Sequence, residues 1–163
     1  MNAVIRSRSN AERLGHPFLL RVGETPLFEL TRIPPRGVRV LAKLEAANPG
    51  GSVKDRAGRA IVEAALRAGE LPGRRLLDAS SGNTGIAYAM LGAALEFGVT
   101  LCVPGSASAE RKKILRAYGA EVIETDPLEG SDGAIRHARA LAQDDDRFFY
   151  ADQYSNPANP GAH

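Results

Sequence analysis

Short apolar runs alternate with longer segments of helical period from Val38 to the end of the chain. The apolar runs predict strands at residues 38–44, 75–79, 99–103, 121–125 and 147–151. The segments between them repeat apolar residues every three or four positions, which predicts helices at residues 53–68, 84–97, 109–118 and 132–143. Five strands alternating with four helices indicate an α/β fold, an open parallel sheet with helices on both faces.

Capping residues delimit these helices. Ser52, Ser108 and Ser131 are the expected N-caps of the first, third and fourth helices, because a serine hydroxyl can accept a backbone N–H of the first turn. Gly69 and Gly119 are expected to end the first and third helices, since glycine readily adopts the left-handed conformation found there.

The chain is expected to divide into three parts: an N-terminal arm (residues 1–37), the α/β domain (38–152) and a tail (153–163). In parallel sheets, ligands bind beyond the carboxyl ends of the strands. Ligand-binding and catalytic residues are therefore expected in the segments that follow the predicted strands. These segments are residues 46–52, 80–85, 104–108, 126–131 and 152–156.

The composition is that of an ordinary globular protein, with 163 residues, 44% hydrophobic and 25% charged. Twenty-one basic and nineteen acidic residues are spread along the chain, and there is no Trp, which argues against a nucleic-acid partner. No run approaches the roughly 20 apolar residues of a membrane span. The lone Cys102 lies in an apolar run and predicts a buried thiol in a reducing, cytoplasmic compartment.

The first residues carry Arg6, Arg8 and Arg13 among serines and asparagines, which is weakly typical of an organelle transit peptide. Glu12 and the short length of the segment favour an ordinary N-terminal arm. We therefore keep the cytoplasmic prediction.

Several common catalytic motifs are absent. There is no G-x-G-x-x-G, no Walker loop and no G-x-S-x-G around Ser106. His16, His137 and His163 are scattered along the chain, and surface positions are expected for all three. Neither a metal site nor a His-based triad is predicted.

The first loop of chemical interest is N-P-G-G-S-V-K-D-R, which puts Lys54 in the opening turn of a helix. The positive end of the helix dipole disfavours a cation there and favours the neutral amine, a nucleophile suited to Schiff-base formation with an aldehyde. On this loop alone, a surface lysine whose neighbour Asp55 supports the helix start is the simpler interpretation.

The second loop is S-S-G-N-T-G, residues 80–85, which opens an apolar helix. Its glycines allow close backbone approach to a ligand, and the free N–H groups of the helix start, with nearby hydroxyls, make an anion site. Simple N-capping explains this loop equally well. These residues leave open whether the anion is a phosphate or a carboxylate.

Considered together, the two loops change the interpretation. Lys54 and Asn83 are separated by one helix and one strand and are expected at the same edge of the sheet. A lysine able to form a Schiff base beside an anion site indicates a pyridoxal phosphate site.

At this point the sequence resembles the cysteine synthase and cystathionine β-synthase family, pyridoxal-phosphate enzymes of the tryptophan-synthase-β fold (fold type II). The matching strings are residues 23–27 (G-E-T-P-L), 43–45, 48–56, 80–85, 110–111, 118–121 and 153–160. The departures are mild, with Glu24 where Asn is frequent and Ser80 where Thr is frequent.

The resemblance implies a role for each site residue. Lys54 would hold pyridoxal phosphate and act as the general base on the substrate α-proton, and Asn83 would bond the cofactor 3′ oxygen. The anion would be the substrate α-carboxylate. Its implied binding residues are Ser80, Ser81, Gly82, Thr84 and Gln153. The implied reaction is β-replacement, in which acetate leaves O-acetylserine and sulfide adds to give cysteine.

The resemblance also implies what lies outside this sequence. Family members continue past this length and carry a phosphate-binding G-T-G-G-T string that does not occur here. We therefore expect the N-terminal portion of a larger enzyme, inactive alone, with the second domain absent. The arm would pack on that domain, which leaves its apolar residues Val22, Leu27, Phe28 and Leu30 exposed.

The implied partners are a small amino acid substrate, a second copy of the intact enzyme in a homodimer, and serine acetyltransferase. Two alternatives in the same family stay open, namely cystathionine β-synthase and O-phosphoserine sulfhydrylase. An alternative of another class is a non-catalytic binding module, either truncated or a pseudo-enzyme.

Overall fold

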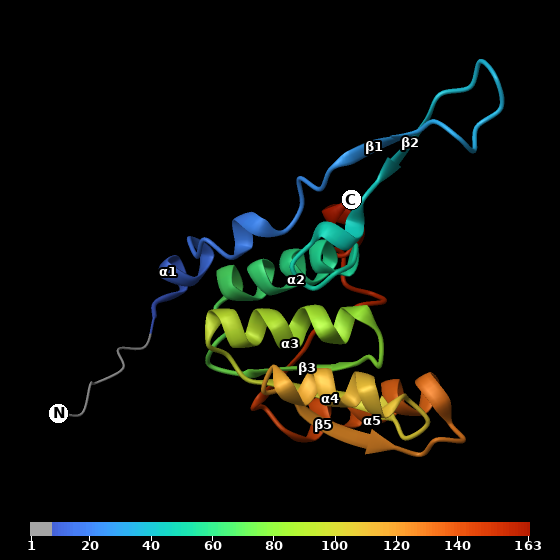
Figure 1. The fold of residues 1–163 in the computed structure, drawn as a ribbon. Helices are drawn as coiled ribbons and strands as arrows, with labels where there is room; N and C mark the ends of the chain where they lie inside the picture. The colour runs from blue at the N-terminus through green and yellow to red at the C-terminus, as the bar shows by residue number, and fades with distance from the viewer. Residues whose placement is uncertain (1–7) are drawn as a thin grey trace.

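The computed structural model describes residues 8–163 and has a four-stranded parallel sheet of order β5–β4–β3–β6 at its centre (Figure 1). The strands are β3 (Arg75–Ala79), β4 (Val99–Pro104), β5 (Glu121–Thr125) and β6 (Phe148–Tyr150). The helices between them are α3 (Asn83–Leu95), α4 (Ala109–Ala117) and α5 (Gly130–Asp144). The predicted α/β class with a parallel sheet is confirmed.

The predicted first strand is not part of this sheet. β2 (Val40–Lys43) pairs antiparallel with β1 (Leu27–Leu30), with Leu27 opposite Lys43, in a separate two-stranded sheet. This β1–β2 hairpin extends away from the rest of the molecule (Figure 1). The prediction that residues 38–44 join the parallel sheet was wrong, because a short apolar run indicates a strand without indicating its partner.

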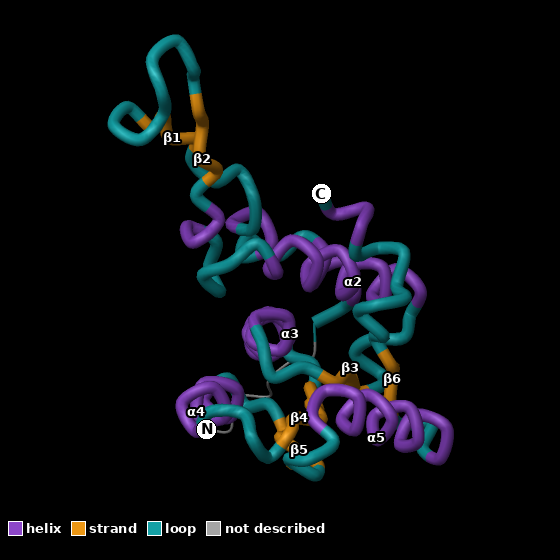
Figure 2. The backbone as a smooth tube through the Cα atoms, turned by 90° about the vertical axis from the view of Figure 1, so that its right-hand side faces the viewer, coloured by secondary structure: helices purple, strands orange, loops and turns teal. Residues whose placement is uncertain are grey.

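Helices cover both faces of the parallel sheet (Figure 2). On β3, Leu76 belongs to the core under α3 and α4, and its neighbour Leu77 belongs to the core under α5. This alternation follows from the period of two along a strand. A further helix, α2 (Lys54–Ala68), packs on the outer side of α3.

The segment before the hairpin packs on the α/β domain. In α1 (Asn10–Leu14), the buried Arg13 donates from Nε to a backbone carbonyl at the end of α3, at 2.7 Å. Val22 is buried, contrary to expectation, whereas Leu27 and Phe28 are 59% and 57% exposed. Leu20, in the 3₁₀ turn before the hairpin (Leu19–Arg21), is also exposed, at 73%. Arg6, part of the segment weakly typical of a transit peptide, lies outside the described residues.

The predicted caps are partly confirmed. Ser108 accepts the backbone N–H of Arg111 and caps α4, and Gly69 ends α2 in the left-handed conformation. Gly119, at φ +83°, directly follows the C-cap of α4. The other two serines are not the N-cap residues, although the Ser52 hydroxyl accepts the backbone N–H of Lys54, the first residue of α2, at 3.1 Å. The N-caps of α2 and α5 are Val53 and Glu129, and neither caps through its side chain.

Several expectations from composition concern single residues. Cys102 is fully buried on β4, and its thiol is free. His137 and His163 are exposed, while His16 is half-buried and accepts the backbone N–H of Phe18. Across residues 8–163, no helix combines the length and apolar character needed to cross a bilayer.

Candidate functional site

A cavity of about 440 Å³ lies at the carboxyl ends of β3, β4 and β6. The strand order reverses here, because β4 and β5 follow β3 on one side and β6 then pairs with its other side. Open α/β sheets bind ligands at such a switch point. The volume lies within the roughly 300–1,000 Å³ typical of small-molecule sites.

Every site residue predicted from the sequence lines this cavity. These residues are Lys54, Ser80, Ser81, Gly82, Asn83, Thr84 and Gln153. They come from the start of α2, the β3–α3 loop and the segment after β6. Pro104, Ser131, Tyr154 and Asn159 also line the cavity, although the sequence predicted no ligand-binding role for them. Pro104 and Ser131 lie in segments that follow predicted strands, and Asn159 lies in the last matching string.

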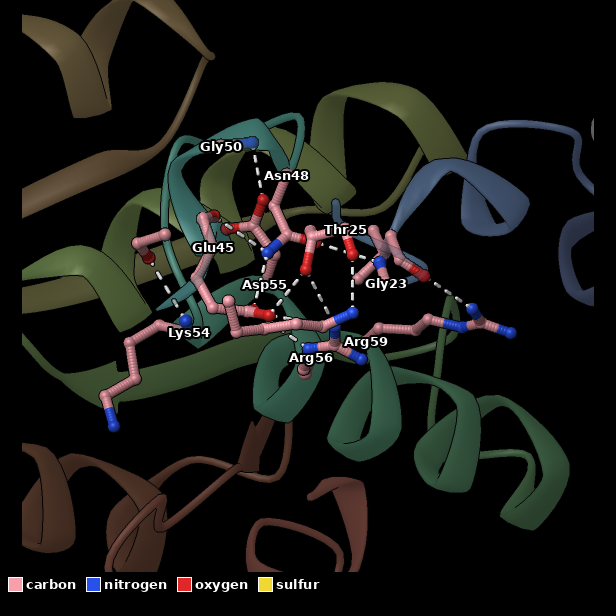
Figure 3. Close-up of polar contacts among 12 residues, drawn as sticks. Gly23, Thr25, Glu45, Asn48, Gly50, Lys54, Asp55, Arg56 and Arg59 are labelled. Carbon is pink, nitrogen blue, oxygen red and sulfur yellow. Dashed lines mark hydrogen bonds and ion pairs between the residues drawn. The ribbon is translucent and has the colours of Figure 1, made fainter. Parts of the chain in front are cut away.

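Lys54 is the first residue of α2, as predicted, but it does not reach the cavity from a strand of the parallel sheet. The strand before it belongs to the hairpin, and the packing of α2 on α3 brings the two helix starts together. Among residues 8–163, no hydrogen bond or ion pair engages the Lys54 amine. Figure 3 shows its side chain pointing away from the polar residues around Glu45 and Arg56.

The conformation of the turn before Lys54 explains why this turn contains two glycines. Gly51 has φ +82°, a conformation that L side chains rarely adopt. A Cβ on Gly50 would lie 2.5 Å from the Asp55 carboxylate, which accepts the Gly50 N–H. Asp55 is fully buried, and burial raises the pKa of its carboxyl group. The N-P-G-G-S string is therefore explained by a tight turn closed on Asp55.

The β3–α3 loop is held by its own first serine. The Ser80 hydroxyl accepts the backbone N–H groups of Gly85 at 3.0 Å and of Gly82 at 3.4 Å. A Cβ on Gly85 would lie 2.7 Å from the Ser80 carbonyl oxygen, so that glycine serves the packing of the loop rather than the approach of a ligand.

The N-cap residue of α3 is Gly82, which has no side chain to cap the helix, and Ser80 caps only the N–H of Gly85 in the first turn. Among the described residues, no partner accepts the N–H groups of Asn83 and Thr84. Free N–H groups at the positive end of a helix bind anions. The cavity therefore has an anion-binding wall in addition to a lysine amine.

Gln153 is buried and lines the cavity beside the end of β3. Its side-chain Nε2 donates to the Ala79 carbonyl at 2.9 Å, and Asn159 Nδ2 donates to the Gln153 carbonyl at 2.7 Å. The preceding residue, Asp152, has φ +43°, and such strained backbone is common at functional sites. One N–H of the Gln153 amide remains for a ligand.

Asp78 is the residue beside the site that sequence reasoning missed. It is 1% exposed near the end of β3, and its two oxygens accept the backbone N–H groups of Ala79 (2.8 Å) and Gln153 (3.2 Å). Burial raises the pKa of Asp78 to about 6. The available signal was a single acidic residue within the apolar run L-L-D-A.

These residues fit pyridoxal phosphate, because an unpaired lysine amine suits its aldehyde and the cavity can hold a small aromatic molecule. The match to known proteins agrees. The family model described as pyridoxal-phosphate dependent enzyme matches residues 18–163. The cysteine synthase of Aquifex aeolicus is 51% identical over 148 residues, which are 87% of this chain and 45% of that protein.

Solved structures give the same result. The structure of O-ureido-L-serine synthase superposes with a TM-score of 0.85 at 39% identity, over 90% of this chain and 46% of that one. A cysteine synthase from Entamoeba histolytica gives 0.84 at 38% identity, over 100% of this chain and 48% of that one. The chain thus spans about half the length of these relatives. It belongs to the family of pyridoxal-phosphate-dependent enzymes, of the cysteine synthase type and fold type II, as the sequence motifs predicted.

Proposed function

We propose that this chain carries the cofactor lysine and the substrate carboxylate site of a cysteine synthase, which converts O-acetylserine and sulfide to cysteine and acetate. The observation that supports the proposal is that the Lys54 amine and the N–H groups of Asn83 and Thr84, all without partners among residues 8–163, meet at one cavity. Pyridoxal phosphate, when bound, supplies an electron sink for the negative charge that develops on the substrate Cα.

In this proposal the residues of the chain have separate tasks. Lys54 holds the cofactor and, once released by the substrate amine, moves the proton at Cα. Asn83 bonds the cofactor 3′ oxygen. The hydroxyls of Ser81 and Thr84, the loop N–H groups and Gln153 bind the substrate carboxylate.

Ser80 and Gly82 have a more structural task than the motif suggested. The Ser80 oxygen already accepts two backbone N–H groups, so its main contribution is the shape of the loop. A Cβ on Gly82 would meet nothing within 4 Å, and this residue contributes open space at the start of α3.

We also propose that the β1–β2 hairpin packs on the remainder of the enzyme. Its support is the exposed apolar surface of Leu27, Phe28 and Leu41, which ordinary monomeric domains bury. The homodimer and the serine acetyltransferase partner implied by the resemblance stay proposals for the whole enzyme.

The test of the lysine is direct. The chain is incubated with pyridoxal phosphate, and the visible band of a protein-bound Schiff base is recorded before and after borohydride reduction. Lys54→Ala should abolish the band, and Lys113→Ala, at an exposed position on α4, should retain it. A band of equal size in Lys54→Ala contradicts the assignment, and no band in the unmodified chain favours the non-catalytic module.

The substrates are tested on the whole enzyme. O-Acetylserine is compared with O-phosphoserine as the donor, and sulfide with homocysteine as the nucleophile. We expect acetate release from O-acetylserine with sulfide. Turnover of O-phosphoserine alone, or of homocysteine in preference to sulfide, would assign the chain to one of the two alternatives in the family.

A further inference from the structure

A polar cluster outside the cavity joins α2 to the base of the hairpin. Arg56 donates to the Glu45 carboxylate through both Nε and Nη2, each at 2.9 Å. The Thr25 hydroxyl donates to Glu45 Oε1 at 2.7 Å and accepts from Arg56 Nη2 at 3.3 Å (Figure 3). We call Thr25, Glu45 and Arg56 the clasp.

The clasp connects three places in the chain. Thr25 lies two residues before β1, and Glu45 lies two residues after β2, in a one-turn 3₁₀ helix (Glu45–Ala47). Arg56 lies two residues after Lys54 on α2. Both strands of the hairpin are therefore fastened, at their base, to the turn of helix that carries the lysine.

A second contact extends the clasp to the turn before Lys54. Asn48 Nδ2 donates to Glu45 Oε2 at 2.9 Å, and Asn48 Oδ1 accepts the backbone N–H of Gly23 at 2.8 Å. Each oxygen of the Glu45 carboxylate thus accepts two hydrogen bonds. A fully satisfied network of this kind holds one geometry rather than several.

The clasp is partly buried and does not line the cavity. The side chains of Arg56 and Glu45 are 22% and 21% exposed, and neither they nor Thr25 contact the space beside Lys54. The Arg56 guanidinium holds the pKa of Glu45 near 2, well below its ordinary value of 4.5. Because this ion pair lies outside the cavity, it can affect Lys54 only through the position of α2.

We propose that the clasp positions Lys54, so that the placement of the hairpin sets how readily the lysine amine captures an aldehyde. The contacts that carry the inference are those of Arg56 with Glu45 and Thr25, one from each end of the hairpin. The proposal rests on the proposed function only for the identity of the aldehyde, pyridoxal phosphate. Thr25, Glu45 and Arg56 are positioning residues, and Lys54 is the reacting one.

The experiment compares two lysines within the same molecule. The 163-residue chain is incubated with limiting pyridoxal phosphate and reduced with borohydride at intervals, and mass spectrometry of peptides measures labelling at Lys54 and at the exposed Lys113. The quantity compared is the ratio of the two initial rates. The thiol of Cys102, which is fully buried, reports in the same samples whether each variant is folded.

Glu45→Gln and Arg56→Lys each remove the two-pronged ion pair, and Arg56→Lys does so without changing the charge. We expect the Lys54-to-Lys113 ratio to fall by about tenfold in both, since a partly buried charge loses its partner or its geometry. Glu63→Gln is the matched control. It breaks pairs with Arg59 and Arg67 on the same helix, and the ratio should stay within about twofold.

Each outcome decides one proposal. An unchanged ratio in Glu45→Gln and Arg56→Lys, with Cys102 protected, overturns the positioning role of the clasp. A native chain that labels Lys54 no faster than Lys113 overturns the proposed function. If Glu45→Gln or Arg56→Lys exposes Cys102, Thr25→Val replaces them in the test, because it removes one hydroxyl at similar size. We expect the labelling ratio to fall by about threefold in Thr25→Val. No change there also overturns the proposal.

Discussion

Asp78 and Gln153 are joined by a hydrogen bond from the Gln153 backbone N–H to Asp78 Oδ2, at 3.2 Å, between residues 75 positions apart. The bond connects the end of β3 to the segment that closes the cavity. No ion pair balances the Asp78 carboxylate among residues 8–163, and its neighbours Tyr88, Tyr150, Cys102 and Asp152 bring no positive charge. Arg139 lies near this cluster, but its guanidinium faces the Asp152 carboxylate, at 3.8 Å.

Asp78→Asn should remove the loss of folding stability that ionisation of the buried Asp78 carboxyl causes as the pH rises. Burial raises the pKa of Asp78 from 3.8 to about 6, so the folded state holds the proton more tightly than the unfolded state. The stability of the native chain therefore falls as the pH rises through that window, by up to about 3 kcal/mol. The measurement is the free energy of unfolding by denaturant, taken at several pH values between 3.8 and 6. As the pH rises, the stability of Asp78→Asn should increase relative to that of the native chain. Asp144→Asn, at an exposed position on α5, is the control, and a parallel pH course for both variants would contradict the prediction.

Arg56→Met should act with the opposite pH dependence. Its loss leaves the Glu45 carboxylate without its partner and should lower the free energy of unfolding near neutral pH by about 1–3 kcal/mol. Arg56 lowers the pKa of Glu45 from 4.5 to about 2, so the stabilisation is present above 4.5 and is lost as the pH falls through 2. Acid titration of both chains should show their stabilities converging in that range. Arg67→Met, at a 62% exposed position, should cost less than about 0.5 kcal/mol.

Gly85→Ala and Gly82→Ala should differ although they lie three residues apart. The new Cβ at Gly85 would lie 2.7 Å from a backbone oxygen of Ser80, which cannot move without shifting the loop. We expect a loss of about 1–3 kcal/mol in the free energy of unfolding. Gly82 has open space and an ordinary φ of −107°, and its variant should stay within about 0.5 kcal/mol. Equal losses would mean that the two glycines serve the same purpose.

Cys102 should be inert to thiol reagents in the folded chain. Its side chain is fully buried, and burial raises the pKa of the thiol to about 11, which leaves little thiolate at neutral pH. Labelling by iodoacetamide should be slow under native conditions and should accelerate with denaturant along the unfolding transition. Rapid labelling without denaturant would show that the core between β4 and α5 opens locally.

The elements that the sequence predicted correctly are those whose signal is local. The strands β3 to β6 and the helices between them follow from periodicity. The loops around Lys54 and Ser80 were selected for their glycines and polar residues at helix starts, and they line one cavity. The first residue of each helix was predicted only to within one turn. Ser52 and Ser131 satisfy the local rule for an N-cap, yet α2 and α5 begin after Val53 and Glu129.

The features that were missed depend on contacts between distant segments. β2 has the composition of a core strand, but within residues 8–163 it pairs with β1 alone, and the pattern of one strand does not contain that choice. Val22 is buried because the segment after α1 packs on the domain. Asp78 resembles any acidic residue until β6 places the Gln153 N–H beside it. In each case, burial was decided by a partner far along the chain.

The pairing of β6 with β3 has a consequence for folding. β3 is the first strand of the parallel sheet and β6 is the last, so their contact closes a loop that contains β4, β5 and three helices. Such closure has a high entropic cost and comes late when folding is dominated by local contacts. Until it forms, one edge of β3 is open and Gln153 is absent from the cavity. We therefore expect the pocket to be completed late in folding, after the lysine helix and the serine loop have formed.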